Sequence, residues 1–320
     1  MALAGGPRQG PRSTAAHRGN RPLDRGIRAL NEVALVFGGK SELLGVLSEP
    51  TAEPRQESRP AFLLLNAGTV GRVGPNRLYV KLARSLAARG FPVLRFDFSG
   101  VGDSPPRADH LPLDESTVDE VREAVDLLEE RGTADRFVLL GICSGGYFAL
   151  RAACADTRVS GLAMINCSGP LEVTDREIAR TLVRHYRRIA LHSSFRAKTL
   201  RKLLTLDFDR RGVLEAVRTQ WTSARPSAGA TRPAALDLEA DVRTVCRRGV
   251  RTLFIHSEGD VGLDYMQLYL GAAIRELSGS GSLQFEVLPR ANHVFTLTAH
   301  QAQLVESVGR WAVSLVREDV

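Results

Sequence analysis

Gly141-Ile142-Cys143-Ser144-Gly145-Gly146 directly follows the apolar run Arg136-Phe137-Val138-Leu139-Leu140. This stretch predicts a buried strand that turns abruptly into a helix. Glycines lie two residues before and two residues after Cys143, a spacing typical of a turn whose central residue takes a strained backbone conformation and tolerates only small neighbours. Such a turn presents its central side chain for chemistry, so Cys143 is the candidate nucleophile.

The turn can be aligned in two ways. With Cys143 at the centre, the flanking residues are Gly141 and Gly145. With Ser144 at the centre, one flank is the β-branched Ile142, which would crowd the turn. Steric fit therefore favours Cys143, and Ser144 is the alternative nucleophile. A buried, inert thiol in a glycine-rich turn is the structural alternative to both.

Apolar runs alternate with helical periodicity along the rest of the chain, which indicates an α/β fold with a mostly parallel sheet. The first two expected strands are joined through Gly38-Gly39-Lys40 as a hairpin. The eight expected strands cover residues 33–37, 43–47, 61–65, 92–96, 136–140, 162–165, 253–255 and 285–288. Expected helices include one face formed by Leu78, Leu82 and Leu86, the ranges 117–131 and 145–155, and a final helix carrying Leu304, Val308, Trp311 and Leu315.

Basic residues are concentrated in two segments. The chain of 320 residues has a formal net charge of +7, and residues 1–30 contain six arginines against one acid, Asp24. Residues 171–220 contain twelve Lys and Arg against six acids, so the remaining residues are acidic overall. We expect residues 1–30 to be a disordered basic leader and 171–245 to be a helical cap inserted in a core of 31–170 plus 246–320.

Composition excludes several classes of protein. No apolar run approaches the roughly 20 residues of a membrane span, and no basic stripe accompanies a nucleic-acid-binding motif. The four cysteines show no metal-ligand spacing and no disulfide framework. We therefore expect a cytoplasmic protein without a membrane span, a bound metal or a nucleic-acid partner, and no cofactor is indicated.

Two later segments offer partners for a nucleophile, each just after an expected strand. Asp260 follows the strand that ends at Ile255, and His293 follows the strand that ends at Leu288. A nucleophile needs a base, and the base needs an orienting acid, at the carboxyl edge of the sheet. Asp264 is the alternative acid, and Glu258 is a weaker rival.

These motifs resemble those of the α/β-hydrolase superfamily over almost the whole chain after residue 30. The resemblance is carried by residues 141–146, the loop 97–104, Asp260 and His293. It implies an eight-stranded sheet with helices on both faces and a cap, and a Cys143-His293-Asp260 triad. The Cys-centred elbow is similar to that of dienelactone hydrolases, whereas the surrounding sequence resembles capped esterase, thioesterase and serine-aminopeptidase-like lineages.

The resemblance also implies an oxyanion hole made by the backbone N–H of Ser144 and by a second amide in the turn after residue 65. The superfamily usually has His-Gly at the start of this turn, and here Asn66-Ala67-Gly68 takes its place. The second donor therefore stays open between Gly68 and Thr69.

The implied activity is cleavage of a small-molecule ester or thioester, free or carrier-bound, through an acyl-cysteine intermediate. The alternatives are acyl transfer by the same chemistry, a hydrolase centred on Ser144, and a non-catalytic interaction protein with a hydrolase fold. The cap arginines, among them Arg180, Arg184, Arg187 and Arg188, would either meet an anionic substrate or form a solvated helical face. The sequence does not predict an oligomeric state.

Overall fold

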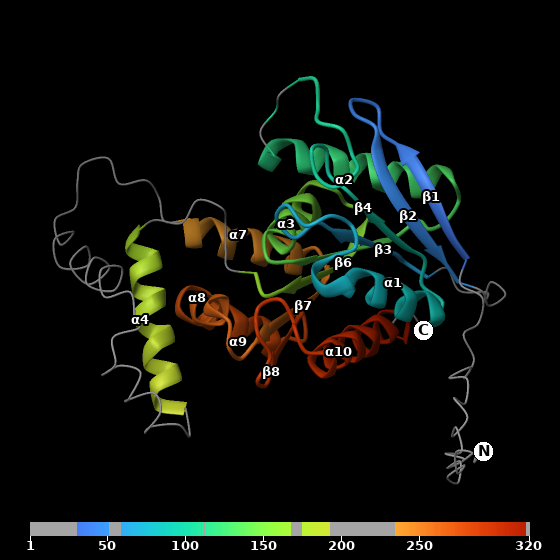
Figure 1. Ribbon diagram of the computed structural model, residues 1–320. Helices are drawn as coiled ribbons and strands as arrows, with labels where there is room; N and C mark the ends of the chain where they lie inside the picture. Colours follow the sequence, from blue (N-terminus) through green and yellow to red (C-terminus); the bar gives the residue numbers. More distant parts are fainter. Residues whose placement is uncertain are drawn as a thin grey trace, which may run out of the picture.

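The computed structural model describes residues 31–50, 59–109, 111, 113–167, 175–192 and 234–317 (Figure 1). Its centre is an eight-stranded sheet in the order β1-β2-β4-β3-β5-β6-β7-β8. The pairs β1·β2 and β2·β4 are antiparallel, and all other neighbouring strands are parallel. The strands are β1 (Asn31–Phe37), β2 (Leu43–Glu49), β3 (Ala61–Leu65), β4 (Val93–Phe96), β5 (Phe137–Ile142), β6 (Val159–Ile165), β7 (Arg251–Ser257) and β8 (Leu283–Leu288). The expected mostly parallel sheet of eight strands is confirmed.

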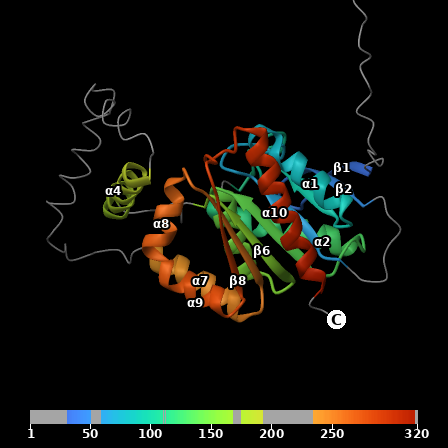
Figure 2. The same cartoon turned by 90° about the horizontal axis from the view of Figure 1, so that it is seen from below.

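Helices cover both faces of the sheet, as the superfamily resemblance implies. The described helices are η1 (Pro75–Arg77), α1 (Leu78–Ala88), α2 (Leu113–Glu130), α3 (Ser144–Ala155), α4 (Asp175–His192), α7 (Ala234–Arg247), α8 (Val261–Tyr269), α9 (Gly271–Gly279) and α10 (Thr298–Arg317). Helices α1 and α10 pack together over one face, which Figure 2 shows from below. Helices α2, α3, α7, α8 and α9 contribute to the apolar cluster on the other face.

Strand β3 explains why the central strands are continuous apolar runs. All five of its residues are buried. Ala61, Leu63 and Leu65 belong to one apolar cluster, and Phe62 and Leu64 belong to the other. Because successive side chains of a strand point to opposite faces, a strand covered on both faces must be apolar at every position. Burying each Leu or Phe stabilises the fold by about 1.5–3 kcal/mol.

Some element boundaries differ from those expected. The β1–β2 hairpin forms as predicted, with Phe37 opposite Leu43. Helix α2 begins at Leu113 and not at Thr117. Helices α8 and α9, which separate β7 from β8, were not anticipated. The Asp260 side chain begins α8 by accepting a hydrogen bond from the Gly262 N–H at 2.9 Å, so this candidate acid also caps a helix.

The segment expected as a cap, 171–245, contains two described helices with different surroundings. Helix α7 packs on the core, since Leu238, Val242 and Val245 are buried in the same apolar cluster as α3. Helix α4 instead lies against α8, at the edge of the molecule in both views (Figures 1 and 2). Residues 171–174 and 193–233, and the expected leader 1–30, lie outside the described residues.

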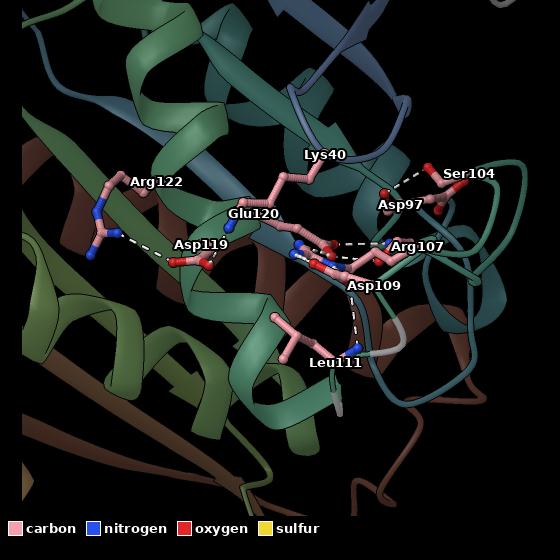
Figure 3. A network of polar contacts seen from close by, with 10 residues as sticks. Lys40, Asp97, Ser104, Arg107, Asp109, Leu111, Asp119, Glu120 and Arg122 are labelled. Atoms are coloured by element: carbon pink, nitrogen blue, oxygen red, sulfur yellow. Dashed lines mark hydrogen bonds and ion pairs between the residues drawn. The ribbon is translucent and has the colours of Figure 1, made fainter.

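A buried polar network fixes the loop that follows β4, as Figure 3 shows. The Arg107 guanidinium, whose side chain is 4% exposed, contacts Asp109 and Glu120 of α2. At the start of the loop, the Ser104 hydroxyl donates to the Asp97 carbonyl oxygen at 2.7 Å. Buried charges are tolerated when they are paired and hydrogen-bonded in this way. The network anchors the loop beside the turn that follows β3.

Candidate active site

Cys143 occupies the strained position between β5 and α3. Its backbone angles are φ 57° and ψ −127°, a conformation that L-residues rarely adopt. A Cβ atom on Gly141 would lie 2.0 Å from the carbonyl carbon of Gly145, and one on Gly145 would lie 2.5 Å from the Asn66 carbonyl oxygen. Only glycine fits at either flank, so of the two possible alignments the backbone adopts the one centred on Cys143.

Three side chains from distant parts of the chain meet at the carboxyl edge of the sheet. The Cys143 thiol is hydrogen-bonded to the His293 imidazole. The other side of that ring, Nδ1, lies 2.9 Å from Oδ2 of Asp260. Asp260 is almost fully buried, whereas the His293 side chain is 38% exposed. The loops after β5, β7 and β8 therefore place a thiol, an imidazole and a carboxylate in one hydrogen-bonded chain.

The electrostatics of these three side chains favour a thiolate beside an imidazolium. The hydrogen bond to His293 is the largest factor that holds the pKa of the Cys143 thiol below its usual value, against the opposing effect of burial. Hydrogen bonds to Asp260 and then to Cys143 raise the pKa of His293 to about 10. The other thiols differ, because burial raises the pKa of Cys154 to about 11 and also raises that of Cys246. At neutral pH, Cys143 is therefore the most nucleophilic of these three thiols.

The turn after β3 directs an amide toward the elbow. The Gly68 N–H donates to Oγ of Ser144 at 2.8 Å, with Gly68 at φ 58°. The backbone N–H of Ser144 is hydrogen-bonded to the Cys143 sulfur. Of the two amides left open by the sequence, the structure directs the Gly68 N–H toward the elbow, and Thr69 is exposed.

Asn66, which stands where the superfamily usually has histidine, closes this turn. Its buried side chain donates to the Val70 carbonyl oxygen at 3.0 Å and accepts from the Phe98 N–H at 2.7 Å. The turn is thus tied both to itself and to the loop after β4. An asparagine directly after a buried strand was the only sequence signal of this role.

The three acidic residues considered as orienting acids have separate partners. Asp264 is fully buried in the first turn of α8, and its carboxylate contacts His185 at 2.8 Å and Arg188 at 2.9 Å, both from α4. The His293 ring is bonded to Asp260. The other rival, Glu258, accepts from the Arg290 N–H at 2.8 Å.

Sequence reasoning missed a pair of residues that support the histidine loop. Asn166 directly follows β6, is fully buried and has a φ of 47°. Its amide donates to the His293 carbonyl oxygen at 2.8 Å and to Oγ of Ser257 at 2.9 Å. The Ser257 hydroxyl in turn donates to the Asn292 carbonyl oxygen at 2.9 Å. These bonds fasten the loop that carries His293 onto the ends of β6 and β7.

Among the described residues, no group of three or more His, Cys, Asp and Glu side chains is arranged to hold a metal ion. In the same part of the chain, no helix combines the length and apolarity needed to cross a membrane.

Comparison with known proteins identifies the fold and the family. The family model described as the alpha/beta hydrolase family matches residues 62–307. No curated protein sequence matches the chain. A dienelactone hydrolase from Anabaena variabilis is similar in structure, with a TM-score of 0.54, 15% identity and coverage of 89% of this chain and 98% of that one.

Two solved esterase structures are also similar. Est1E from Butyrivibrio proteoclasticus has a TM-score of 0.54 and 17% identity, over 89% of this chain and 99% of that one. A thermophilic esterase from Thermogutta terrifontis has a TM-score of 0.52 and 19% identity, over 89% and 99% of the two chains. At these identities the likeness shows a shared fold.

Proposed function

Because the chain belongs to the alpha/beta hydrolase family, we propose that it hydrolyses an ester or thioester through an acyl-cysteine intermediate, with Cys143 as nucleophile, His293 as base and Asp260 as orienting acid. The observation that carries the proposal is the hydrogen-bonded chain from the Cys143 thiol through His293 to Asp260 at 2.9 Å. Nucleophile, base and orienting group in this order are the general arrangement for covalent catalysis.

In the first half of the reaction, the Cys143 thiolate attacks the carbonyl carbon of the substrate. Negative charge develops on the carbonyl oxygen, which takes the place of the Ser144 hydroxyl at the Gly68 N–H and also accepts from the Ser144 N–H. The His293 imidazolium gives its proton to the departing alcohol or thiol as the ester or thioester bond breaks. An acyl-thioester on Cys143 and a neutral imidazole remain.

In the second half, neutral His293 takes a proton from water, and the hydroxide adds to the acyl carbon. Collapse of this intermediate releases the carboxylic acid and restores the thiolate and imidazolium. Asp260 keeps Nδ1 of the ring protonated throughout, so that Nε2 faces the reacting atoms. A thiolate suits activated esters and thioesters better than amides, because from an amide adduct the thiolate is the better leaving group.

The proposed substrate is a small-molecule acyl ester or thioester, free or carrier-bound. The similar dienelactone hydrolase and esterase structures support ester chemistry only through the shared fold, since their identities to this chain are 15–19%. We place the protein in a reducing cytoplasm, because a working thiol needs that environment to stay reduced.

The test is to identify the acylated atom directly. The protein is exposed to a panel of aryl esters and acyl-thioesters and examined by intact mass spectrometry, and peptide mapping then locates the adduct. We expect the acyl group on Cys143, and turnover should be lost in Cys143→Ala. Cys154→Ala is the matched control, because that thiol is also partly buried but has a raised pKa. An adduct on Ser144, or full turnover by Cys143→Ala, would refute the proposal.

A further inference from the structure

We propose that Arg188 is a positioning residue for this reaction: through Asp264 and the acid loop, it makes the docking of α4 a condition for correct placement of Asp260. The inference rests on the proposed function and adds to it a role for the inserted helix. The acid loop is defined here as residues 258–260, which join β7 to α8.

The first step is the burial of Asp264. Its carboxylate is fully buried, and the side chains of the described residues that contact it come from α4: Arg188, His185 and, at 3.6 Å, Arg184. Arg188 contributes Nε at 3.0 and 3.1 Å and Nη2 at 2.9 Å. A buried carboxylate that loses its partners is strongly destabilising, so α8 and α4 are energetically coupled through this residue. Figures 1 and 2 show the two helices side by side.

The second step is the reach of Arg188 beyond Asp264. Its Nη1 donates to the Glu258 carbonyl oxygen at 2.6 Å, and its Nη2 contacts the Asp260 carbonyl oxygen at 3.4 Å. One planar guanidinium therefore binds both ends of the acid loop and the first turn of α8. A lysine ammonium is a single point charge and lacks this fixed fork of donors.

The third step connects the acid loop to the imidazole. Asp260 uses one carboxylate oxygen to cap α8 through Gly262 and the other to hold His293. A shift of the Asp260 backbone would weaken both bonds together. Misplacement of a catalytic group by 1 Å can reduce the rate by about 10²-fold. Arg188 acts through Asp260 and touches no reacting atom, so it is a positioning residue.

The experiment compares Arg188→Ala and Arg188→Lys with the wild type, using an ester that acylates the wild-type enzyme. Arg187→Ala is the matched control, since Arg187 is the neighbouring arginine of α4 and is exposed. We expect both Arg188 variants to lose kcat, by about 10²-fold for alanine, with KM changed little. The alkaline limb of the pH–rate profile should also move to lower pH, because a displaced Asp260 no longer stabilises the His293 imidazolium. Arg187→Ala should match the wild type in kcat and in the pH profile.

Several results would overturn the inference. Folded Arg188→Ala with wild-type kcat and an unmoved pH profile would show that Arg188 has only a structural role. A rise in KM alone in Arg188→Ala would assign α4 to substrate binding. Full activity in Arg188→Lys would show that the planar guanidinium is not required to place Asp260. If Arg188→Ala does not fold, Arg188→Lys supplies the same comparison. Failure of the proposed function is distinct, because wild-type Cys143 would then form no acyl adduct.

Discussion

His256 should make this protein sensitive to mild acid, and an apolar residue in its place should remove that sensitivity. The ring is fully buried at the end of β7 and stacks on Phe285, with ring centroids 5.7 Å apart. Neither ring nitrogen has a hydrogen-bond partner among the residues that the structure describes. Burial lowers the pKa of His256 to about 4, from an ordinary value of 6.5.

The sign and size of the effect follow from these two values. Between pH 6.5 and about 4 the unfolded chain binds a proton at His256 and the folded protein does not. Stability therefore falls as the pH falls through this range. A pKa difference of about 2.5 units corresponds to roughly 3 kcal/mol in full, of which about 2 kcal/mol is lost by pH 5.

The assay is urea unfolding of the wild type and His256→Leu at pH 7.5 and pH 5. Leucine has a similar volume and carries no polar atoms, so the variant should be about as stable as the wild type at pH 7.5. At pH 5 it should be the more stable of the two by about 2 kcal/mol. Equal losses of stability in the two proteins between these pH values would refute the reasoning, since other titrating groups are common to both.

Three further predictions concern the candidate site. Gly145→Ala should lower kcat/KM by at least about 10²-fold, because the added Cβ would lie 2.5 and 2.6 Å from two backbone carbonyl oxygens. Gly279→Ala is the control and should leave kcat/KM unchanged, because its added Cβ would meet nothing within 4 Å. Asn166→Ala should lower both the melting temperature and kcat, because each buried group left unpaired costs about 1–3 kcal/mol and the His293 loop loses a hydrogen bond; an unchanged kcat would contradict this. The rate of Cys143 alkylation by iodoacetamide should rise with pH along a titration curve whose pKa is below the usual thiol value of 9.0. Turnover should fall as His293 loses its proton near pH 10. An alkylation rate that follows a thiol of unshifted pKa would refute the ion pair.

Much of the architecture was predictable because it depends on local properties. A strand such as β3, buried on both faces, must be apolar at consecutive positions, and a helix covering the sheet must be apolar every three to four residues. Helices α8 and α9 escaped prediction. Helix α8 is capped by Asp260, the same residue whose other carboxylate oxygen faces His293.

The residues of the candidate site show the same distinction between local and long-range determinants. The sequence by itself determined the elbow, because the steric demand for glycine around Cys143 is local and leaves a fixed spacing. It also placed Asp260 and His293 after strands, and carboxyl ends of parallel strands share one edge of the sheet. Only the tertiary structure decided which acid faces His293, since Asp260 and Asp264 lie four residues apart and are equivalent by type.

The supporting residues were also decided by the tertiary structure alone. Asn66 and Asn166 are single polar residues after strands, and their partners lie on other loops. Arg188 is one of several arginines in a basic segment, and nothing in that segment distinguishes it from exposed Arg187. The physical reason is range: steric and periodic constraints act between neighbours in the chain, whereas a hydrogen bond requires two groups within about 3 Å, a distance that folding sets for residues far apart in sequence.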